Sequence, residues 1–201
     1  MTGILFIVAT PIGNLDDITF RAVEILKSID IILAEDTRHS KKLLKHLNIV
    51  KPIRAFHEHN EREKTKDIIG ELHSGKSIAL ISDAGTPLIS DPGYFLVAQA
   101  KKEGLRVVPI PGASALITAL SASGLASDSF TFLGFLPSKK TARVKLLKSL
   151  VGRAETSIFY ESPKRILATL TDMRRIFGDS RKVCLAKELT KVFETIQTDS
   201  I

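Results

Sequence analysis

Residues 80–93 read LISDAGTPLISDPG, which is the most informative stretch of the sequence. It follows an apolar run, Ser77 to Ile81, that is typical of a buried strand, and it precedes a helix-like run, Tyr94 to Lys102. Open α/β sheets bind ligands at the carboxyl ends of their strands, where small and rigid residues let a ligand approach the backbone. We therefore predict a ligand site within Asp83 to Pro87.

The end of this stretch has a simpler explanation. Asp91 fits the N-cap of the following helix and Pro92 fits its first residue, since aspartate accepts from free N–H groups and proline lacks one. A tight turn before a capped helix would account for these two residues. It would not account for Asp83 to Pro87.

Strands and helices alternate over the first half of the chain. We expect strands at residues 5–9, 31–34, 53–56, 77–81 and 106–110, and helices at 17–28, 40–47, 64–73, 94–102 and 113–123. This order predicts a mostly parallel sheet with crossover helices. Polar or glycine-rich turns follow four of the strands, at residues 10–14, 35–38, 82–87 and 111–114, and in a parallel sheet these turns share one edge.

The second half has a different pattern after a linker at residues 124–129. We expect strands at 130–135, 156–160, 182–187 and 193–198, and helices at 140–151 and 163–177. The chain is therefore predicted to be an α/β protein of two domains, with an N-terminal domain at 1–121 and a C-terminal α/β domain at 122–201.

Composition excludes several classes of protein. With 44% hydrophobic and 25% charged residues, the 201-residue chain can bury a core and is not expected to be disordered. It has no apolar run long enough to cross a bilayer and no basic start of a signal peptide. Its single cysteine, Cys184, rules out an internal disulfide and suits a reducing cytosol. No zinc-ligand spacing occurs, and His57-Glu58-His59 fits a polar loop, so no metal is expected.

The positive charge is concentrated in the second half. The net charge is +7, and residues 1–100 contain 12 Lys or Arg against 13 Asp or Glu, whereas residues 101–201 contain 17 against 9. The densest part comprises Lys139, Lys140, Arg143, Lys145 and Lys148, with no acid between them. This asymmetry favours an anionic macromolecule, most commonly nucleic acid, as a partner. A solvated helix face explains any single one of these residues equally well.

Known catalytic and nucleotide-binding motifs are absent from the strand ends. None matches GxGxxG, the P-loop or the GxSxG elbow, so the first sheet is expected to hold a small ligand by backbone contacts. Asp83 is available there for a hydroxyl or ammonium group. In the second half, Phe135, Phe159 and Tyr160 could stack on a purine or belong to the core. Glu161 and Glu188 lie beside basic residues, so structural ion pairs are an alternative for both.

Seven motifs, in this order, resemble one family, the bacterial 16S ribosomal RNA cytidine 2′-O-ribose methyltransferases of the tetrapyrrole methylase superfamily. They are TPIGNL at 10–15, AEDTR at 34–38, SDAGTPLISDPG at 82–93, PIPG at 109–112, GFLP at 134–137, FYES at 159–162 and AKELTK at 186–191. The resemblance runs from about Leu5 to the last residue. The turn at 10–14 matches the RNA branch, because the tetrapyrrole branch has a GxGPG-like turn there.

The resemblance implies a class III methyltransferase fold, with a mostly parallel sheet in the first domain and a mixed sheet in the second. It implies S-adenosylmethionine as the cofactor, bound in the cleft between the domains, a cytidine of 16S rRNA in the small ribosomal subunit as the substrate, a homodimer and a cytoplasmic location. Family members continue past residue 201, so a closing strand of the second domain is expected to be missing here.

The resemblance also assigns residues to the cofactor. Pro11 is expected near the sulfonium, and the methionine and ribose portions are expected to contact Asp83, Ala84, Gly85 and Pro87, with Ala113 and Ser114 lining the pocket. The residues expected to hold the adenine are Phe159, Tyr160, Ala186 and Leu189.

The expected reaction is an in-line attack of a ribose 2′-oxygen on the sulfonium methyl group, mainly accelerated by positioning. A general base would help, and Asp36, His57 and Glu161 are candidates between which the sequence does not choose. Arg38, Lys139, Lys140 and Arg143 are expected to contact RNA phosphates. Two alternatives stay open: methylation of a tetrapyrrole or another small acceptor, and a non-catalytic RNA-binding protein.

Overall fold

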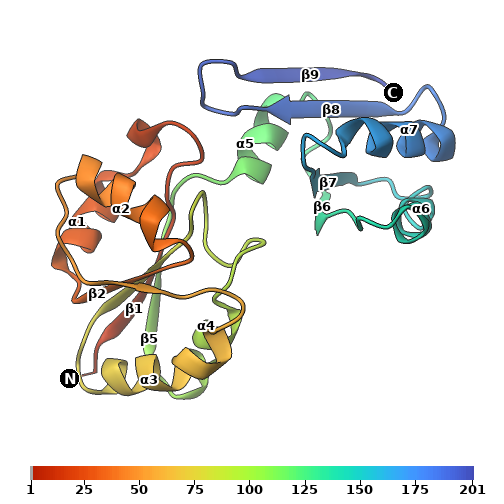
Figure 1. The fold of residues 1–201 in the computed structure, drawn as a ribbon. Helices are drawn as coiled ribbons and strands as arrows, with labels where there is room; N and C mark the ends of the chain where they lie inside the picture. Colours follow the sequence, from red (N-terminus) through yellow and green to blue (C-terminus); the bar gives the residue numbers. More distant parts are fainter. Residues whose placement is uncertain (1) are drawn as a thin grey trace. The chain divides into compact units, whose positions relative to one another are not determined.

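The computed structural model describes residues 2–201, which form two compact units (Figure 1). The first unit ends at Ser114, and the second runs from Ala115 to Ile201. Every predicted strand and helix is present, with ends shifted by up to three residues. Among the described residues, no helix is both long and apolar enough to cross a bilayer.

The first unit contains a five-stranded sheet in the order β3-β2-β4-β1-β5, and all of its strand pairs are parallel. The strands are β1 (Ile4–Val8), β2 (Ile31–Ala34), β3 (Ile53–Ala55), β4 (Ile78–Ile81) and β5 (Arg106–Ile110). The predicted parallel sheet is therefore confirmed, and its polar turns lie at one edge.

Helices cover both faces of this sheet (Figure 1). The 3-10 turn η1 (Leu15–Asp17) leads to α1 (Phe20–Ser28), which shares one face with α2 (Thr37–His46); α3 (Glu61–His73) and α4 (Tyr94–Lys102) cover the other. In β4, Ile78 and Leu80 join the core under α3 and α4, whereas Ala79 and Ile81 join the core under α1 and α2. Burial on both faces explains why these strands are continuously apolar.

The start of α4 corrects a prediction. Asp91 is not the N-cap, because α4 begins at Tyr94, after Gly93 with a φ of 131°. The free N–H groups of Gly93 and Phe95 donate instead to Oε1 of Glu61, at 3.0 and 2.8 Å. Glu61 is buried on α3, so one helix caps the next through a contact distant in the sequence.

The second unit contains two two-stranded ribbons with helices around them. Its elements are α5 (Ala115–Ala122), β6 (Phe130–Phe135), α6 (Lys140–Lys148), β7 (Thr156–Tyr160), α7 (Ile166–Phe177), β8 (Lys182–Lys187) and β9 (Thr195–Ser200). β6 and β7 pair in parallel, and β8 and β9 pair antiparallel. Among the described strands, the expected mixed sheet is thus divided into one parallel and one antiparallel ribbon.

The boundary between the units lies before α5 rather than between Ser121 and Ala122, where the sequence placed it. Leu116 and Leu120 of α5 line a pocket of the second unit. The carbonyl after α5, Ser123 O, accepts a hydrogen bond from Thr198 Oγ1 of β9 at 2.5 Å. These contacts attach α5 to the second unit, although its sequence continues the alternation of strands and helices in the first unit.

Candidate functional site

The turns after β1 and β4 are joined at the carboxyl edge of the first sheet. Thr10 and Gly85 exchange two backbone hydrogen bonds, with N···O distances of 2.9 and 3.0 Å. The Thr10 hydroxyl also donates to Ser82 O at 3.0 Å. Gly85 has a φ of 86°, which suits glycine because it has no Cβ. The turn within the predicted site, Asp83 to Pro87, is therefore held in place by its neighbour.

The turns after β2 and β5 reach the same place. The Asp36 N–H donates to Asp83 Oδ1 at 3.1 Å, and the Thr86 hydroxyl donates to Ala113 O at 3.0 Å. Four strand ends thus meet through direct contacts, as the sequence predicts. The contacts bring Asp83 and Gly85 together with Ala113.

A small cavity of about 30 Å³ lies at this edge. Its lining residues are Thr10, Pro11, Leu15, His39, Ser40, Leu43, Ser82 and Asp83. Two predicted cofactor residues, Pro11 and Asp83, therefore share one cavity. Its volume is enough for a single water molecule.

Two carboxyl groups to which the sequence assigned no catalytic or binding role have raised pKa values at this edge. Burial, together with the charges of Glu35 and Asp83, raises the pKa of Asp91 to about 6 despite a hydrogen bond from Ser82. Burial and the charge of Asp83 likewise raise the pKa of Glu35. A carboxylate with a pKa closer to neutral accepts a proton more readily at physiological pH. The sequence offered no signal for this, because Asp91 fitted a helix cap and Glu35 a polar turn.

Asp36, one of the three candidate bases, has a structural role. Its carboxylate caps α2 by accepting from Arg38 N at 2.8 Å, and it binds the Arg38 guanidinium through Nε at 3.1 Å and through a second nitrogen at 2.8 Å. Hydrogen bonds from Arg38 hold the pKa of Asp36 well below its usual range. Such a carboxylate is a weak base. The Arg38 side chain is 90% exposed, so it stays accessible to a phosphate.

His57, the second candidate, lies in the loop after β3. Its Nε2 is 3.0 Å from Asn60 Nδ2, and its ring packs edge-on against His59 at 5.9 Å. His57 thus has one buried ring nitrogen, Nδ1, without a hydrogen-bond partner among the described residues.

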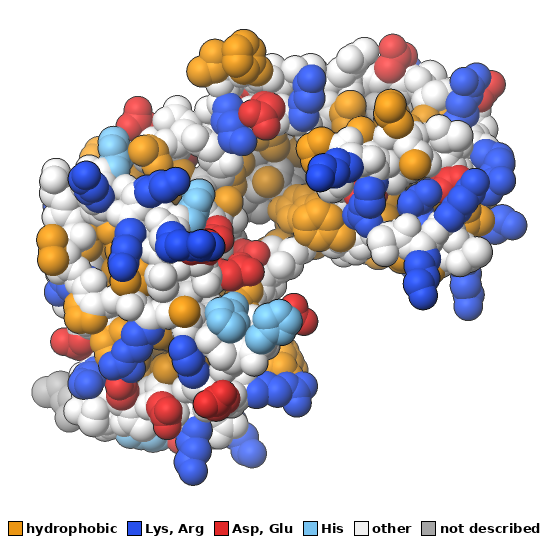
Figure 2. All heavy atoms as spheres, viewed as in Figure 1, with side chains coloured by type: hydrophobic (Ala, Val, Ile, Leu, Met, Phe, Trp, Pro, Cys, Tyr) orange, Lys and Arg blue, Asp and Glu red, His pale blue; other side chains and the backbone are white. Residues whose placement is uncertain are grey.

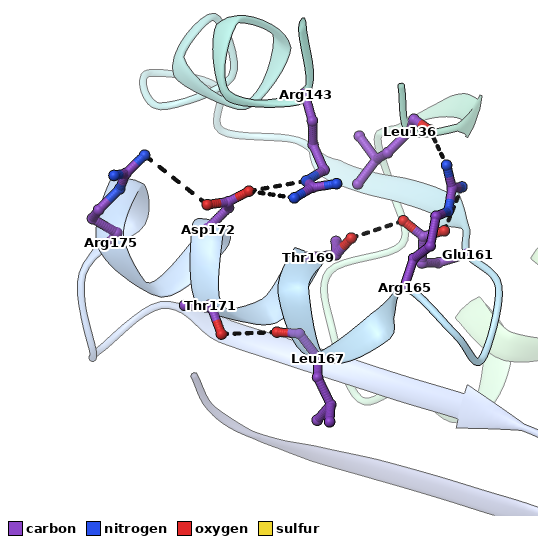
Figure 3. Close-up of polar contacts among 9 residues, drawn as sticks. All are labelled: Leu136, Arg143, Glu161, Arg165, Leu167, Thr169, Thr171, Asp172 and Arg175. Atoms are coloured by element: carbon purple, nitrogen blue, oxygen red, sulfur yellow. Dashed lines mark hydrogen bonds and ion pairs between the residues drawn. The ribbon is translucent and has the colours of Figure 1, made fainter. Parts of the chain in front are cut away.

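Glu161, the third candidate, is fixed inside the second unit (Figure 3). It accepts hydrogen bonds from Ser162 N and Thr169 Oγ1, both at 2.8 Å, and pairs with Arg165. Burial alone would raise its pKa, but these hydrogen bonds outweigh burial, and the pKa of Glu161 lies below its ordinary value. The structure supports the ion-pair alternative for Glu161, and likewise for Glu188, which pairs with Lys191 at 3.3 Å.

The four predicted adenine contacts lie together in the second unit. A pocket of about 550 Å³ is formed by side chains of α5, β7, α7 and β8. Phe159, Tyr160, Ala186 and Leu189 all belong to its lining. Its walls are mainly apolar, and its volume is in the range of small-molecule sites. The pocket can therefore take a flat aromatic group.

The basic stretch after β6 divides into exposed and buried members. Lys139 and Lys140 are exposed, as are Lys145 and Lys148 further along α6. Arg143 is only 5% exposed, and its Nε and a second guanidinium nitrogen donate to Asp172 Oδ2 at 3.0 and 2.7 Å (Figure 3). The prediction that Arg143 contacts RNA is wrong, because this arginine joins α6 to α7 inside the unit.

No metal centre is found within residues 2–201, since no group of three or more potential ligands gathers there. The positively charged side chains are spread over the surface, and Figure 2 shows many of them on the second unit.

Comparison with known proteins gives a consistent result. Residues 5–201 match the family model described as Tetrapyrrole (Corrin/Porphyrin) Methylases. The chain is 57% identical over 201 residues to the ribosomal RNA small subunit methyltransferase I of Haemophilus influenzae, covering all of this chain and 71% of that protein. It is 59% identical to the protein of that name in Vibrio cholerae, over 96% of this chain and 67% of that protein.

Two solved structures have a similar fold. One is uroporphyrin-III-C-methyltransferase from Thermus thermophilus, with a TM-score of 0.67 and 19% identity. The other is cobalt precorrin-4 methyltransferase, a cobalamin biosynthetic enzyme, with a TM-score of 0.70 and 17% identity. Each comparison covers 98% of this chain and 85% of the other. At such identities the likeness concerns the fold alone.

Proposed function

The chain belongs to the tetrapyrrole methylase family, and we propose that it transfers a methyl group from S-adenosylmethionine to a ribose 2′-oxygen of a cytidine in 16S ribosomal RNA. The observation that carries this proposal is the identity of 57% along the whole chain with a relative named for methylation of small-subunit ribosomal RNA. The cytidine and the 2′-oxygen come from the motif resemblance. The substrate in turn implies a cytoplasmic location.

The edge of the first sheet fits the cofactor chemically. S-adenosylmethionine has a cationic sulfonium and an ammonium group, and the edge carries the carboxylates of Glu35, Asp83 and Asp91. We propose that Pro11, Asp83, Ala84, Gly85, Pro87, Ala113 and Ser114 hold its methionine and ribose parts. The Asp36 N–H orients the Asp83 carboxylate for this role.

The pocket of the second unit fits the adenine. Phe159 and Tyr160 offer aromatic surface, and Ala186 and Leu189 offer small or apolar surface along the same lining. We propose that these four residues contact the base. Because the pocket is mainly apolar, stacking and burial supply most of the attraction.

When bound, the cofactor supplies an electrophilic methyl group. The residues of the chain have to orient the ribose and accept the proton of its 2′-hydroxyl. Asp36 and Glu161 are held in ion pairs with depressed pKa values, which makes them weak bases. His57, Glu35 and Asp91 remain as proposed proton acceptors, with Arg38, Lys139 and Lys140 as proposed phosphate contacts.

Methyl transfer from labelled S-adenosylmethionine to unmodified small ribosomal subunits tests the proposal. The RNA is digested to nucleosides, and label in 2′-O-methylcytidine is expected. Label in a base-methylated nucleoside would contradict the 2′-oxygen assignment. The Haemophilus influenzae relative is assayed in parallel as a positive control. If that relative is active and this chain transfers no label, the proposed function is contradicted. If this chain instead transfers label to a porphyrinoid, the small-acceptor alternative is established. Sedimentation of the same sample checks the expected homodimer.

A further inference from the structure

Phe135 is an exposed aromatic residue at the carboxyl end of β6. This residue is 57% exposed, and it does not belong to the lining of the 550 Å³ pocket. Figure 2 shows hydrophobic side chains at the surface of the β6 region, next to Lys and Arg side chains of the same unit. A single exposed hydrophobic residue is ordinary, so its surroundings decide whether it has a role.

The ring of Phe135 is held on one side by Tyr160. The two ring centroids are 5.6 Å apart, with an interplanar angle of 63°. Phe132 packs against the same tyrosine at 4.9 Å and 66°. Tyr160 therefore contacts two phenylalanine rings, and this contact favours a defined position for the ring of Phe135. A preorganised ring stacks on a ligand with a smaller loss of entropy.

A bulge in β6 directs Phe135 to this position. Phe132 pairs with Ile158 and Phe135 with Tyr160, so three steps along β6 correspond to two along β7. Gly134, within the bulge, has a φ of 64°. An extra residue changes the direction of the side chains that follow it, and bulges of this kind are common beside functional sites.

The charged residues that follow Phe135 in the sequence are positive. Lys139 and Lys140 follow it closely and are exposed, and Lys164 is exposed on the segment before α7. The nearest acid of that segment, Glu161, is neutralised by Arg165, which also donates to Leu136 O at 3.2 Å (Figure 3). Residues 115–201 contain 14 Lys or Arg against 8 Asp or Glu. An uncharged aromatic face beside free lysines matches a single-stranded nucleic acid, which presents bases and phosphates together.

We propose that Phe135 stacks on an unpaired RNA base while Lys139 and Lys140 contact the neighbouring phosphates, with Tyr160 positioning the ring. This proposal rests on the proposed function, since it assumes an RNA substrate. It adds a residue that makes binding selective for single-stranded RNA. Unpaired bases are recognised in this way because their faces are free, whereas paired bases are stacked inside a helix.

The test is the affinity of the chain for a fluorescent single-stranded RNA oligonucleotide at several salt concentrations. Phe135→Ala is expected to weaken binding about tenfold, as loss of one base stack does. It should leave the slope of log Kd against log salt unchanged, because no charge is lost. Lys140→Ala is expected to reduce this slope by about 0.7, as for one phosphate contact to a single strand.

Two further variants separate stacking from folding and from simple apolar contact. Phe130→Ala removes a phenylalanine that is 39% exposed at the other end of the same strand, and it should bind RNA like the parent chain. Phe135→Trp should keep the affinity, whereas Phe135→Leu should lose it, because leucine has no aromatic face. All variants are first compared by thermal melting.

Several results would overturn the proposal. These are unchanged RNA affinity in Phe135→Ala, full affinity in Phe135→Leu, or an equal loss for a duplex of the same sequence. A parallel loss of S-adenosylmethionine affinity would place Phe135 in the cofactor site, and conversion of a dimer to a monomer would make it a protein contact. Failure of the parent chain to bind any RNA would refute the proposed function as well, so the two failures are distinguishable.

Discussion

The first unit arranges its functional groups with backbone hydrogen bonds, whereas the second arranges them with buried ion pairs. At the edge of the first sheet, Thr10 and Gly85 are joined through main-chain atoms, and the Asp36 N–H orients Asp83. In the second unit, Arg143 with Asp172 and Glu161 with Arg165 hold the helices and the strand ends. Side-chain substitution should therefore disturb the second unit more than the first.

The largest effect is expected for Arg143→Ala. This change leaves the Asp172 carboxylate buried without its main partner, and the free energy of unfolding should fall by about 3–5 kcal/mol. Denaturant unfolding measures the loss. Lys140→Ala, on the same helix but exposed, is the matched control and should stay within about 0.5 kcal/mol of the parent chain. Equal stability of Arg143→Ala and the parent would mean that the pair does not hold α6 to α7.

A smaller loss is expected for Glu61→Ala in the first unit. It removes the acceptor of the Gly93 and Phe95 N–H groups, and one of these groups is buried, so the loss should be about 1–3 kcal/mol. Glu63→Ala, exposed on the same helix, is the control. If the two variants were equally stable, α4 would have to satisfy its first N–H groups in another way.

The third prediction concerns pH and the edge of the first sheet. The pKa of Asp91 is raised to about 6 in the folded chain, so between about pH 4 and 6 the folded state binds more protons than the unfolded state. Asp91 therefore lowers stability as the pH rises through this window. Asp91→Asn should remove this pH-dependent loss of stability. Its free energy of unfolding should exceed that of the parent chain by about 1 kcal/mol above pH 6, once solvent screening is considered, and by little below pH 4. Unfolding curves from pH 3.5 to 7.5 measure it, and a pH-independent difference would contradict it.

The same contrast explains what could be predicted from the sequence. The first sheet could be predicted because its strands are buried on both faces and each ends in a polar turn, and these are local patterns. The contact between Asp83 and the turn after β2 could be predicted from the parallel arrangement of the strands alone. The role of Asp91 could not be predicted, because the actual cap of α4 comes from Glu61, on the preceding helix.

In the second unit, local patterns gave less information. A run of basic residues predicts an exposed face, but Arg143 is buried in an ion pair with Asp172, which lies on another helix. The four adenine contacts were assigned by resemblance, and their convergence on one pocket depends on how two strands from different ribbons are placed. Composition and spacing do not determine such a placement.

The smallest effect is expected for Asp179→Ala. This variant tests whether the burial of an ion pair or its short N···O distance determines how much the pair stabilises the fold. Arg174 Nε is 2.7 Å from Asp179 Oδ1, as short as the shorter Arg143–Asp172 contact, but the two side chains are 64% and 74% exposed. An exposed pair gains little, because water and salt screen its attraction and two flexible side chains must be ordered. The melting temperature of Asp179→Ala should therefore match that of the parent chain at 0.15 M and at 1 M salt. A clear fall at low salt would mean that distance, rather than burial, decides which ion pairs stabilise this unit.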